Sequence, residues 1–276
     1  MIVVITVLAA CIMGLLLYGY CSNHMLKTEH YQISMGRAQE ESVRIVMLAD
    51  LHANTFGKGN RKLIRKIKEQ KPDMICIAGD MTVKNGKGMD SCLALCKELL
   101  SVCPVYYAPG NHEIRMEGYE EYTSRLIKEG VFWLDNEYCS IFLKGCSLGV
   151  YGLNIGEFFY HKFWQKRDFT SQDVGTMLGP AREGEICILL AHNPEYFPVY
   201  REWGADLVLS GHVHGGIAKF PLLGGVIDPS LRLFPKYDSG LFREKDCYMV
   251  LSRGLGTHHI RLRFFNRPEI SVINLS

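Results

Sequence analysis

The sequence lacks an excess of charge of either sign. Its 31 Lys and Arg residues nearly balance 29 Asp and Glu residues, which leaves a formal net charge of +2 over 276 residues. Proteins that bind nucleic acid usually carry a clustered excess of basic residues, because phosphate contacts supply much of the affinity. The composition therefore excludes nucleic acid as an expected partner. The length allows one large domain with an appendage.

Charged side chains are also missing from the first 20 residues, which are almost entirely apolar. A run of about 20 apolar residues is long enough to cross a bilayer as a helix. No Lys or Arg precedes the run, which is unusual for a cleaved secretory signal. A Leu-Ala-Ala-Cys motif that ends at Cys11 resembles a lipidation box, so a lipid-anchored protein is the alternative. The sequence favours an uncleaved, single-pass transmembrane helix over residues 1–21.

Basic residues follow this segment but do not precede it; the nearest are Lys27 and Arg37. The positive-inside rule therefore predicts that the rest of the chain lies on the cytoplasmic side of the membrane. Residues 22–42 are polar and mixed in composition, which predicts a linker between the anchor and the main domain. That domain is expected over residues 43–276.

No pair among the ten cysteines has the Cys-x-x-Cys spacing, so a structural zinc site is not expected. Cys76 and Cys187 fall inside apolar runs, and Cys92 and Cys96 fall on a predicted helix. Such positions suit reduced, buried thiols better than a disulfide framework. Cysteine usage therefore also favours a cytoplasmic domain.

Apolar runs of the length expected for strands buried on both faces recur along the chain. They cover residues 43–49, 74–78, 105–108, 186–191 and 206–209. Amphipathic stretches with helical spacing alternate with the first of these runs, at residues 60–70, 89–101 and 119–129. This alternation predicts an α/β layered fold with a largely parallel sheet.

The stretch from residue 133 to 153 breaks the alternation. It has the pattern of two strands joined by a turn at Lys144-Gly145, which predicts a second sheet packed on the first.

Five short motifs place polar residues at or just beyond the ends of the apolar runs. In chain order they are Asp50-x-His52, Gly79-Asp80, Gly110-Asn111-His112-Glu113, His192-Asn193 and Gly211-His212-x-His214. Because open α/β folds place their ligands at the carboxyl ends of the strands, we expect these side chains to gather at one sheet edge. Two carboxylates, an amide oxygen and four imidazoles suit two divalent cations that share a carboxylate. The motifs predict a dinuclear metal site.

On these motifs the chain resembles the calcineurin-like metallophosphoesterases, from about residue 43 to the C-terminus. The resemblance implies a four-layer α-β-β-α sandwich with two metal ions at the sheet edge. It implies a first metal bound by Asp50, His52 and His214, a second bound by Asn111, His192 and His212, and Asp80 bridging both. It assigns His112 as the general acid. The adjacent Glu113 is expected to hold the His112 imidazole protonated and oriented.

The C-terminal segment resembles one branch of this family, the membrane-anchored bacterial phosphoesterases related to UDP-2,3-diacylglucosamine hydrolases. The resemblance rests on residues 252–257 and 264–270 and on the His-Gly-Gly at residues 214–216. Arg253 and Arg261 are candidate phosphate-binding residues, because guanidinium groups bind phosphate through paired hydrogen bonds. A structural ion pair is the alternative for both.

Together these features predict a metal-dependent phosphoesterase that cleaves a phosphodiester or pyrophosphate in a lipid-linked molecule similar to UDP-diacylglucosamine. One alternative is a phosphodiesterase or phosphatase acting on a soluble nucleotide or phosphoprotein. Another is a catalytically silent, membrane-bound binding protein. The predicted cofactors are two divalent ions, Mn²⁺, Fe²⁺ or Zn²⁺, since carboxylate and imidazole ligands accept each of them.

Two further stretches bear on the substrate. Residues 157–167 are aromatic and basic, and they form either part of the core or a lipid-facing surface that carries Lys162, Lys166 and Arg167. Residues 215–240 are rich in Gly and Pro, which predicts a loop over the site.

Overall fold

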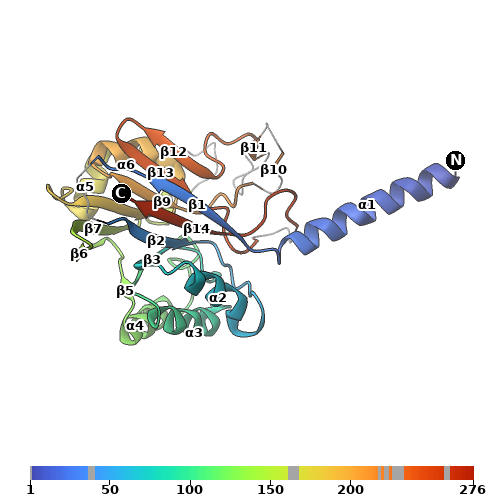
Figure 1. The fold of residues 1–276 in the computed structure, drawn as a ribbon, viewed down its shortest axis with the longest axis horizontal. Helices are drawn as coiled ribbons and strands as arrows, with labels where there is room; N and C mark the ends of the chain where they lie inside the picture. The colour runs from blue at the N-terminus through green and yellow to red at the C-terminus, as the bar shows by residue number, and fades with distance from the viewer. Residues whose placement is uncertain are drawn as a thin grey trace.

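The computed structural model describes residues 2–36, 41–160, 168–216, 219–220, 224–225, 233–257 and 262–276. Two six-stranded sheets pack face to face (Figure 1). In spatial order, the first sheet contains β1 (Lys27–Ile33), β14 (Glu269–Leu275), β2 (Val43–Leu48), β3 (Met74–Ala78), β4 (Val105–Ala108) and β5 (Phe132–Trp133). The second contains β12 (Gly240–Glu244), β13 (Cys247–Leu251), β9 (Leu207–Ser210), β8 (Ile186–Ala191), β7 (Cys146–Leu153) and β6 (Glu137–Leu143).

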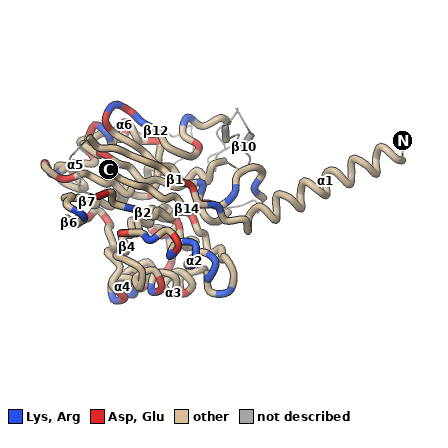
Figure 2. The backbone as a smooth tube through the Cα atoms, viewed as in Figure 1, with Lys and Arg blue, Asp and Glu red and all other residues tan. Residues whose placement is uncertain are grey.

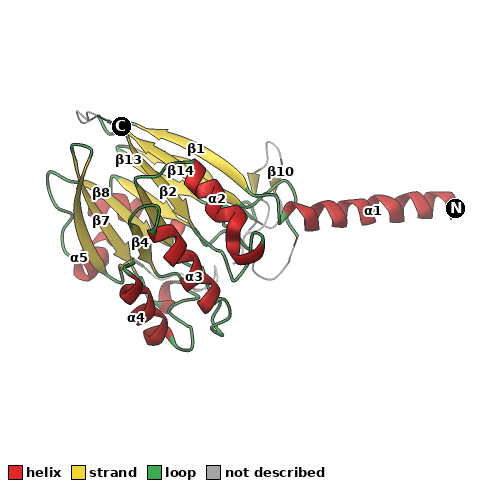
Figure 3. Ribbon diagram, turned by 60° about the horizontal axis from the view of Figure 1, so that its bottom comes forward, coloured by secondary structure: helices red, strands yellow, loops and turns green. Residues whose placement is uncertain are grey.

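Helices cover the outer face of each sheet. On the first sheet they are α2 (Arg61–Glu69), α3 (Met89–Leu100) and α4 (Tyr119–Glu129), and on the second α5 (Ser171–Leu178) and α6 (Phe197–Trp203). Short 3-10 turns (Lys58–Asn60, Glu157–Phe159 and Pro194–Tyr196) and a small hairpin of β10 (Lys219–Phe220) and β11 (Gly224–Gly225) complete the elements. Figure 3 shows α2, α3 and α4 gathered on one side of the strands. The predicted four-layer α-β-β-α sandwich is confirmed.

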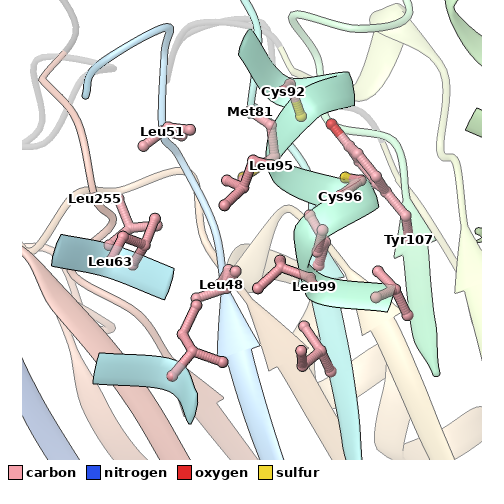
Figure 4. Close-up of a cluster of buried hydrophobic side chains, with 14 of the residues drawn as sticks. Leu48, Leu51, Leu63, Met81, Cys92, Leu95, Cys96, Leu99, Tyr107 and Leu255 are labelled. Atoms are coloured by element: carbon pink, nitrogen blue, oxygen red, sulfur yellow. The ribbon is translucent and has the colours of Figure 1, made fainter. Parts of the chain in front are cut away.

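Three buried clusters hold these layers together. The central one lies between the sheets and includes Met47 from the first sheet and Leu190 from the second. A second cluster lies beneath α2 and α3, where Leu48 and Leu99 pack together (Figure 4). The third lies between the second sheet and its two helices. Strands buried on both faces explain the nearly continuous apolar runs in the sequence.

The first helix, α1 (Ile2–Ser22), projects away from the sandwich (Figure 1). It is 21 residues long, and only Gly19 and Ser22 are buried. Its length and apolar composition make it a candidate membrane span. Figure 2 shows no Lys, Arg, Asp or Glu on α1, whereas Lys and Arg recur along α2. The helix is therefore a candidate anchor, as the sequence predicts.

Part of the linker expected over residues 22–42 is a strand in the structure. Strand β1 lies within it and pairs in parallel with β14, from Lys27 opposite Glu269 to Ile33 opposite Leu275. The side chain of Ile33 is buried, whereas most of the strand remains partly exposed. An edge strand needs few apolar residues because one side of it faces water. Its mixed polar composition therefore concealed a structural strand.

Candidate metal centre

Five of the predicted site residues lie within three residues of the carboxyl ends of strands. Asp50 follows β2, Asp80 follows β3 and Asn111 follows β4 in the first sheet. His192 follows β8 and His212 follows β9 in the second sheet. Strands β2, β3 and β4 are mutually parallel, as are β8 and β9. Their carboxyl ends share one edge, so the packed sheets bring these side chains together.

Backbone conformation at this edge is unusual. Left-handed φ angles occur at Asp50 (52°), His52 (46°), Asp80 (56°), His212 (74°) and His214 (54°). A left-handed conformation costs a residue with a Cβ on the order of 1–2 kcal/mol. Such strain persists where the surrounding structure enforces it, and it concentrates at functional sites. The strained turns direct side chains from both sheets toward one point.

Asp50, His52 and His214 form the first group of polar atoms, and their side chains are buried. The Nε2 atoms of His52 and His214 lie 3.0 Å apart. Oδ1 of Asp50 lies 3.9 Å from Nε2 of His52 and 3.5 Å from Nε2 of His214. One carboxylate oxygen and two imidazole nitrogens thus surround a point that could hold a metal ion.

Asp80, His192 and His212 form a second group. Oδ2 of Asp80 lies 3.1 Å from Nε2 of His192 and 3.8 Å from Nε2 of His52, so it faces both groups. Asn111, which precedes the His112 N–H that donates to Asp80, is buried, and its Oδ1 has no hydrogen-bond partner among the described residues. A buried amide oxygen without a partner is costly unless a ligand satisfies it. This oxygen fits a role in cation binding.

Backbone carbonyls orient two of the imidazoles. Nδ1 of His192 lies 2.6 Å from the carbonyl oxygen of Ala78, and Nδ1 of His214 lies 3.3 Å from that of Gly256. A neutral ring that donates its Nδ1 proton to a carbonyl presents the Nε2 lone pair on its other side. In both residues Nε2 faces a carboxylate, which is the arrangement of a metal-binding histidine.

Burial shapes the electrostatics of the centre. It raises the pKa of Asp50 to about 7, with the nearby Asp80 carboxylate adding to the increase. Burial acts in the same direction on Asp80, yet the imidazoles around it, chiefly His192, hold its pKa well below the usual range. Burial lowers the pKa of His192, but the two carboxylates outweigh it and raise that pKa to about 10. The donor set therefore fits divalent cations, which would replace the protons.

Two glycines allow the strand ends to approach this closely. Gly79 has a φ of 81°, and a Cβ there would lie 2.5 Å from the backbone nitrogen of Gly110. A Cβ at Gly110 would collide with Oδ1 of Asp80. Larger residues at either position would displace the loop that carries Asp80.

The prediction for Glu113 was wrong about its partner. Both carboxylate oxygens face the loop after β3 and the end of β4 instead of the His112 imidazole. Their donors, at 2.7–3.2 Å, are the backbone N–H groups of Asp80, Met81, Thr82 and Gly110 and the hydroxyls of Thr82 and Tyr107. Glu113 is fully buried, and it fixes the conformation of the Asp80 loop.

His112 lies at the rim of the group. Its backbone N–H donates to Oδ1 of Asp80 at 2.8 Å, and its ring packs edge-on against His52, with centroids 4.7 Å apart. Its side chain is partly exposed, whereas the imidazole of His52 is buried. This position places an imidazole between the buried polar groups and solvent.

The two predicted phosphate-binding arginines differ in what the structure shows. Arg253 forms ion pairs with Glu29 at 3.0 Å and with Glu269 at 3.5 Å, which matches the structural alternative. Arg261 lies outside the described residues, as do Lys162, Lys166 and Arg167 of the aromatic stretch.

In the described part of that stretch, Phe159 and Tyr160 pack against other rings, whereas Glu157 and Phe158 are exposed. The ring of Phe159 lies 4.8 Å from that of Phe169. Tyr160, which sequence reasoning missed, packs edge-on against His212 with centroids 5.2 Å apart. The predicted loop over residues 215–240 is described only in part, including β10 and β11.

Comparison with known proteins agrees with this geometry. A family model described as calcineurin-like phosphoesterase matches residues 43–216. The chain belongs to this family. The matched segment contains every predicted metal-binding residue and His112.

Several curated relatives of the chain are named as metallophosphoesterases. An uncharacterized metallophosphoesterase of Helicobacter pylori is 30% identical over 242 residues, covering 86% of this chain and 60% of the relative. The metallophosphoesterase YkuE of Bacillus subtilis is 26% identical over 275 residues, covering 94% of this chain and 89% of the relative. A zebrafish transmembrane protein with a metallophosphoesterase domain is 29% identical over 247 residues, covering 84% of this chain and 53% of the relative. The chain thus spans about 60% of the length of the Helicobacter relative.

Solved structures with similar folds share little sequence with the chain. The phosphopantetheinyl hydrolase of Mycobacterium tuberculosis is 12% identical with a TM-score of 0.49, covering 81% of this chain and 95% of that structure. The protein TT1561 of Thermus thermophilus is 14% identical with a TM-score of 0.49, covering 78% of this chain and 90% of that structure.

Proposed function

We propose that this hydrolase uses two divalent metal ions to cleave a phosphodiester or pyrophosphate bond in a membrane-associated, lipid-linked substrate. The observation that carries the proposal is the position of Asp80. Its Oδ2 faces imidazoles of both polar groups, at 3.1 Å from His192 and 3.8 Å from His52. A carboxylate in that position suits a bridge between two cations.

The buried polar atoms divide into two ligand sets. One ion would be held by Asp50, His52 and His214, the other by Asn111, His192 and His212, and both by Asp80. When bound, such ions neutralise charge on phosphoryl oxygens and lower the pKa of a nucleophilic water. Mn²⁺, Fe²⁺ and Zn²⁺ all suit these ligands.

We assign the general acid to His112. Its imidazole lies at the partly exposed rim, beside His52 and outside the buried ligand groups. From this rim it can reach the leaving oxygen of a bound ester and donate a proton as the bond to phosphorus breaks. The hydrogen bond from its backbone N–H to Asp80 holds His112 close to the proposed metal-binding carboxylate.

The lipid-linked substrate rests on α1. An exposed, uncharged helix of 21 residues would hold the domain at a bilayer, where an acylated substrate is concentrated. A molecule similar to UDP-diacylglucosamine is our first choice, because the C-terminal segment resembles the branch related to UDP-2,3-diacylglucosamine hydrolases. Arg253 is engaged in ion pairs, so we assign it a structural role. Arg261 remains a candidate for phosphate binding.

We place the catalytic domain on the cytoplasmic side. Lys27 is the first Lys or Arg after the apolar helix, and none of the ten cysteines forms a disulfide in the described part of the chain. Maleimide labelling of the exposed Cys21 in sealed, oriented vesicles tests this placement. The vesicles are oriented with the cytoplasmic face inside. Labelling only after they are permeabilised supports the placement, and labelling of intact vesicles contradicts it.

The reaction is tested with the full chain in detergent micelles. We expect Mn²⁺-dependent hydrolysis of bis-p-nitrophenyl phosphate, and loss of it in Asp80→Ala. Asp246→Ala is the control, because Asp246 is exposed in the turn between β12 and β13. Turnover that survives Asp80→Ala would sink the proposal.

Substrate class is tested with UDP-diacylglucosamine, its deacylated headgroup, a cyclic nucleotide and a phosphopeptide. Higher kcat/KM on the acylated compound than on its headgroup supports a lipid-linked substrate. Equal efficiency on both, or preference for the nucleotide or phosphopeptide, favours a soluble substrate instead.

A further inference from the structure

The segment from Arg263 to Glu269 contacts both α1 and the loops of the metal centre. It contains most of the second part of the C-terminal motif, residues 264–270, which the ligand sets and His112 leave unexplained. The segment lies between the end of α1 and the edge where the polar groups meet. Its side-chain contacts reveal what this motif does.

Asn266 is fully buried and binds the loop that carries His214. Its Nδ2 donates to the carbonyl oxygens of His214 at 2.7 Å and of Gly216 at 2.6 Å. Gly215 lies between them with a φ of 68°, and a Cβ there would lie 2.6 Å from Oδ1 of Asn266. The amide thus closes a tight turn around the backbone of a proposed metal ligand.

Arg263 holds a second turn from the same segment. Its guanidinium is buried and donates to the carbonyl oxygens of Arg253 at 2.9 Å, Gly254 at 3.3 Å and, at shorter range, Gly256. This turn adjoins Asp50, because the backbone N–H of Gly256 donates to the Asp50 carbonyl at 2.6 Å. Arg263 therefore supports the backbone behind a second proposed ligand.

The same segment receives the last turns of α1. The backbone N–H of Arg263 donates to the carbonyl of Gly19 at 3.1 Å, and the ring of Phe264 lies against Gly19. A Cβ at Gly19 would lie 2.8 Å from Cε1 of Phe264. Tyr18 and Phe265 add a ring contact with centroids 5.6 Å apart. The junction is packed and hydrogen-bonded, unlike a flexible tether.

We infer that Asn266 and Arg263 are positioning residues that hold the His214 and Asp50 loops in the geometry that binds metal, and that the end of α1 braces them. The inference rests on the proposed metal centre. Helix α1 would then support the metal centre structurally, in addition to holding the domain at the membrane. Residues that orient metal ligands without touching the metal typically change affinity by about 10- to 100-fold when they are replaced.

The first experiment measures Mn²⁺ affinity by calorimetric titration of the full chain in micelles. Asn266→Ala should weaken binding by about 10-fold or more. Asn274→Ala is the matched control, because it also removes a buried C-terminal amide, but one whose Oδ1 accepts from Arg44 on β2. Asp80→Ala tests the metal centre itself. If Asp80→Ala abolishes binding while Asn266→Ala leaves it unchanged, the metal centre stands and the positioning role is overturned.

The second experiment compares two glycines of α1, which also covers the case in which Asn266→Ala fails to fold. Gly19→Leu should separate the helix from Phe264, whereas Gly14→Leu meets nothing within 4 Å. Both changes add the same side chain to the same apolar helix. We expect weaker Mn²⁺ binding and a smaller metal-induced rise in Tm for Gly19→Leu only. Equal Mn²⁺ affinity and equal Tm shifts in the two variants would overturn the bracing role of α1.

Discussion

The Nε2 atoms of His52 and His214 face each other at 3.0 Å, and their rings stack with centroids 4.8 Å apart. His52 follows a strand of the first sheet and His214 a strand of the second, 162 residues later. Two imidazole lone pairs repel at this distance unless a proton or a cation lies close to both. The packing of the two sheets thus creates a site with a strong preference for positive charge.

Metal binding should release protons, in a number that depends on pH. Asp50, with a pKa of about 7, and His192, with a pKa of about 10, both carry protons in the metal-free protein at pH 6. We expect about two protons released per protein at pH 6 and about one at pH 8.5, where Asp50 is already ionised. Calorimetric Mn²⁺ titrations in buffers of different ionisation enthalpy measure this number. Equal release at both pH values would contradict the assignment.

The same groups set the stability of the metal-free protein. The pKa of His192 in the folded state, about 10, exceeds its ordinary value of 6.5. Its contribution is therefore fully present below pH 6.5 and is lost as the pH rises toward 10. We expect the Tm of the metal-free protein to fall between pH 7 and pH 10. His192→Ala should flatten this part of the profile, and an unchanged slope would exclude His192 as its source.

Replacing Glu113 should lower the stability of the fold, because Glu113 binds the Asp80 loop and not the His112 imidazole. Glu113→Ala leaves several buried donors of the Asp80 loop without an acceptor, so we expect a loss of roughly 3–5 kcal/mol of unfolding free energy. Urea denaturation measures the loss. The exposed Glu117 provides a control four residues along the chain, and Glu117→Ala should change stability by less than about 0.5 kcal/mol. Similar losses in both variants would show that Glu113 does not support the loop.

Loss of His112 should depend on the leaving group. A p-nitrophenolate departs without a proton, whereas an alkoxide needs one, so His112→Ala should slow alkyl esters by roughly 10²–10⁴-fold and nitrophenyl esters much less. Kinetics on a series of diesters with leaving groups of graded pKa measure the difference. His30→Ala, at an exposed position of β1, is the control. Equal loss across the series would rule out proton donation by His112.

Strand β1 should matter for folding even though its composition resembles a linker. Ile33 is buried between the sheets, and Ile33→Ala should cost about 2–4 kcal/mol of unfolding free energy. Ile127, which is exposed on α4, gives a matched control, and its replacement by Ala should change little. The two variants are compared by urea denaturation in the same detergent. Equal stability of the two would mean that β1 contributes nothing to the core.

Much of the fold could be predicted because burial on both faces leaves a clear local pattern. The expected strand over residues 74–78 and the expected helix over residues 119–129 have the predicted bounds. The hairpin turn at Lys144-Gly145 joins β6 and β7 as expected. Edge strand β1 escaped this reasoning because its polar residues face water, so no apolar run marks it.

The polar residues of the site could be found from their place after apolar runs, but their contacts could not. Glu113 follows His112 in the chain, yet its carboxylate binds the loop after another strand. Nothing local marks Asn266 as a partner of the His214 loop, which lies 52 residues earlier. Such contacts depend on how loops from separate strands meet.

The sequence by itself determined the layers, the family resemblance and the candidate metal-binding side chains, because burial pattern and donor chemistry are local properties of the chain. Only the tertiary structure decided which donors lie within reach of one another, which carboxylate fixes the Asp80 loop and how α1 meets the segment that contains Arg263. Those features depend on distances between residues far apart in sequence, such as Gly19 and Arg263, and packing sets these distances only after the sheets have formed.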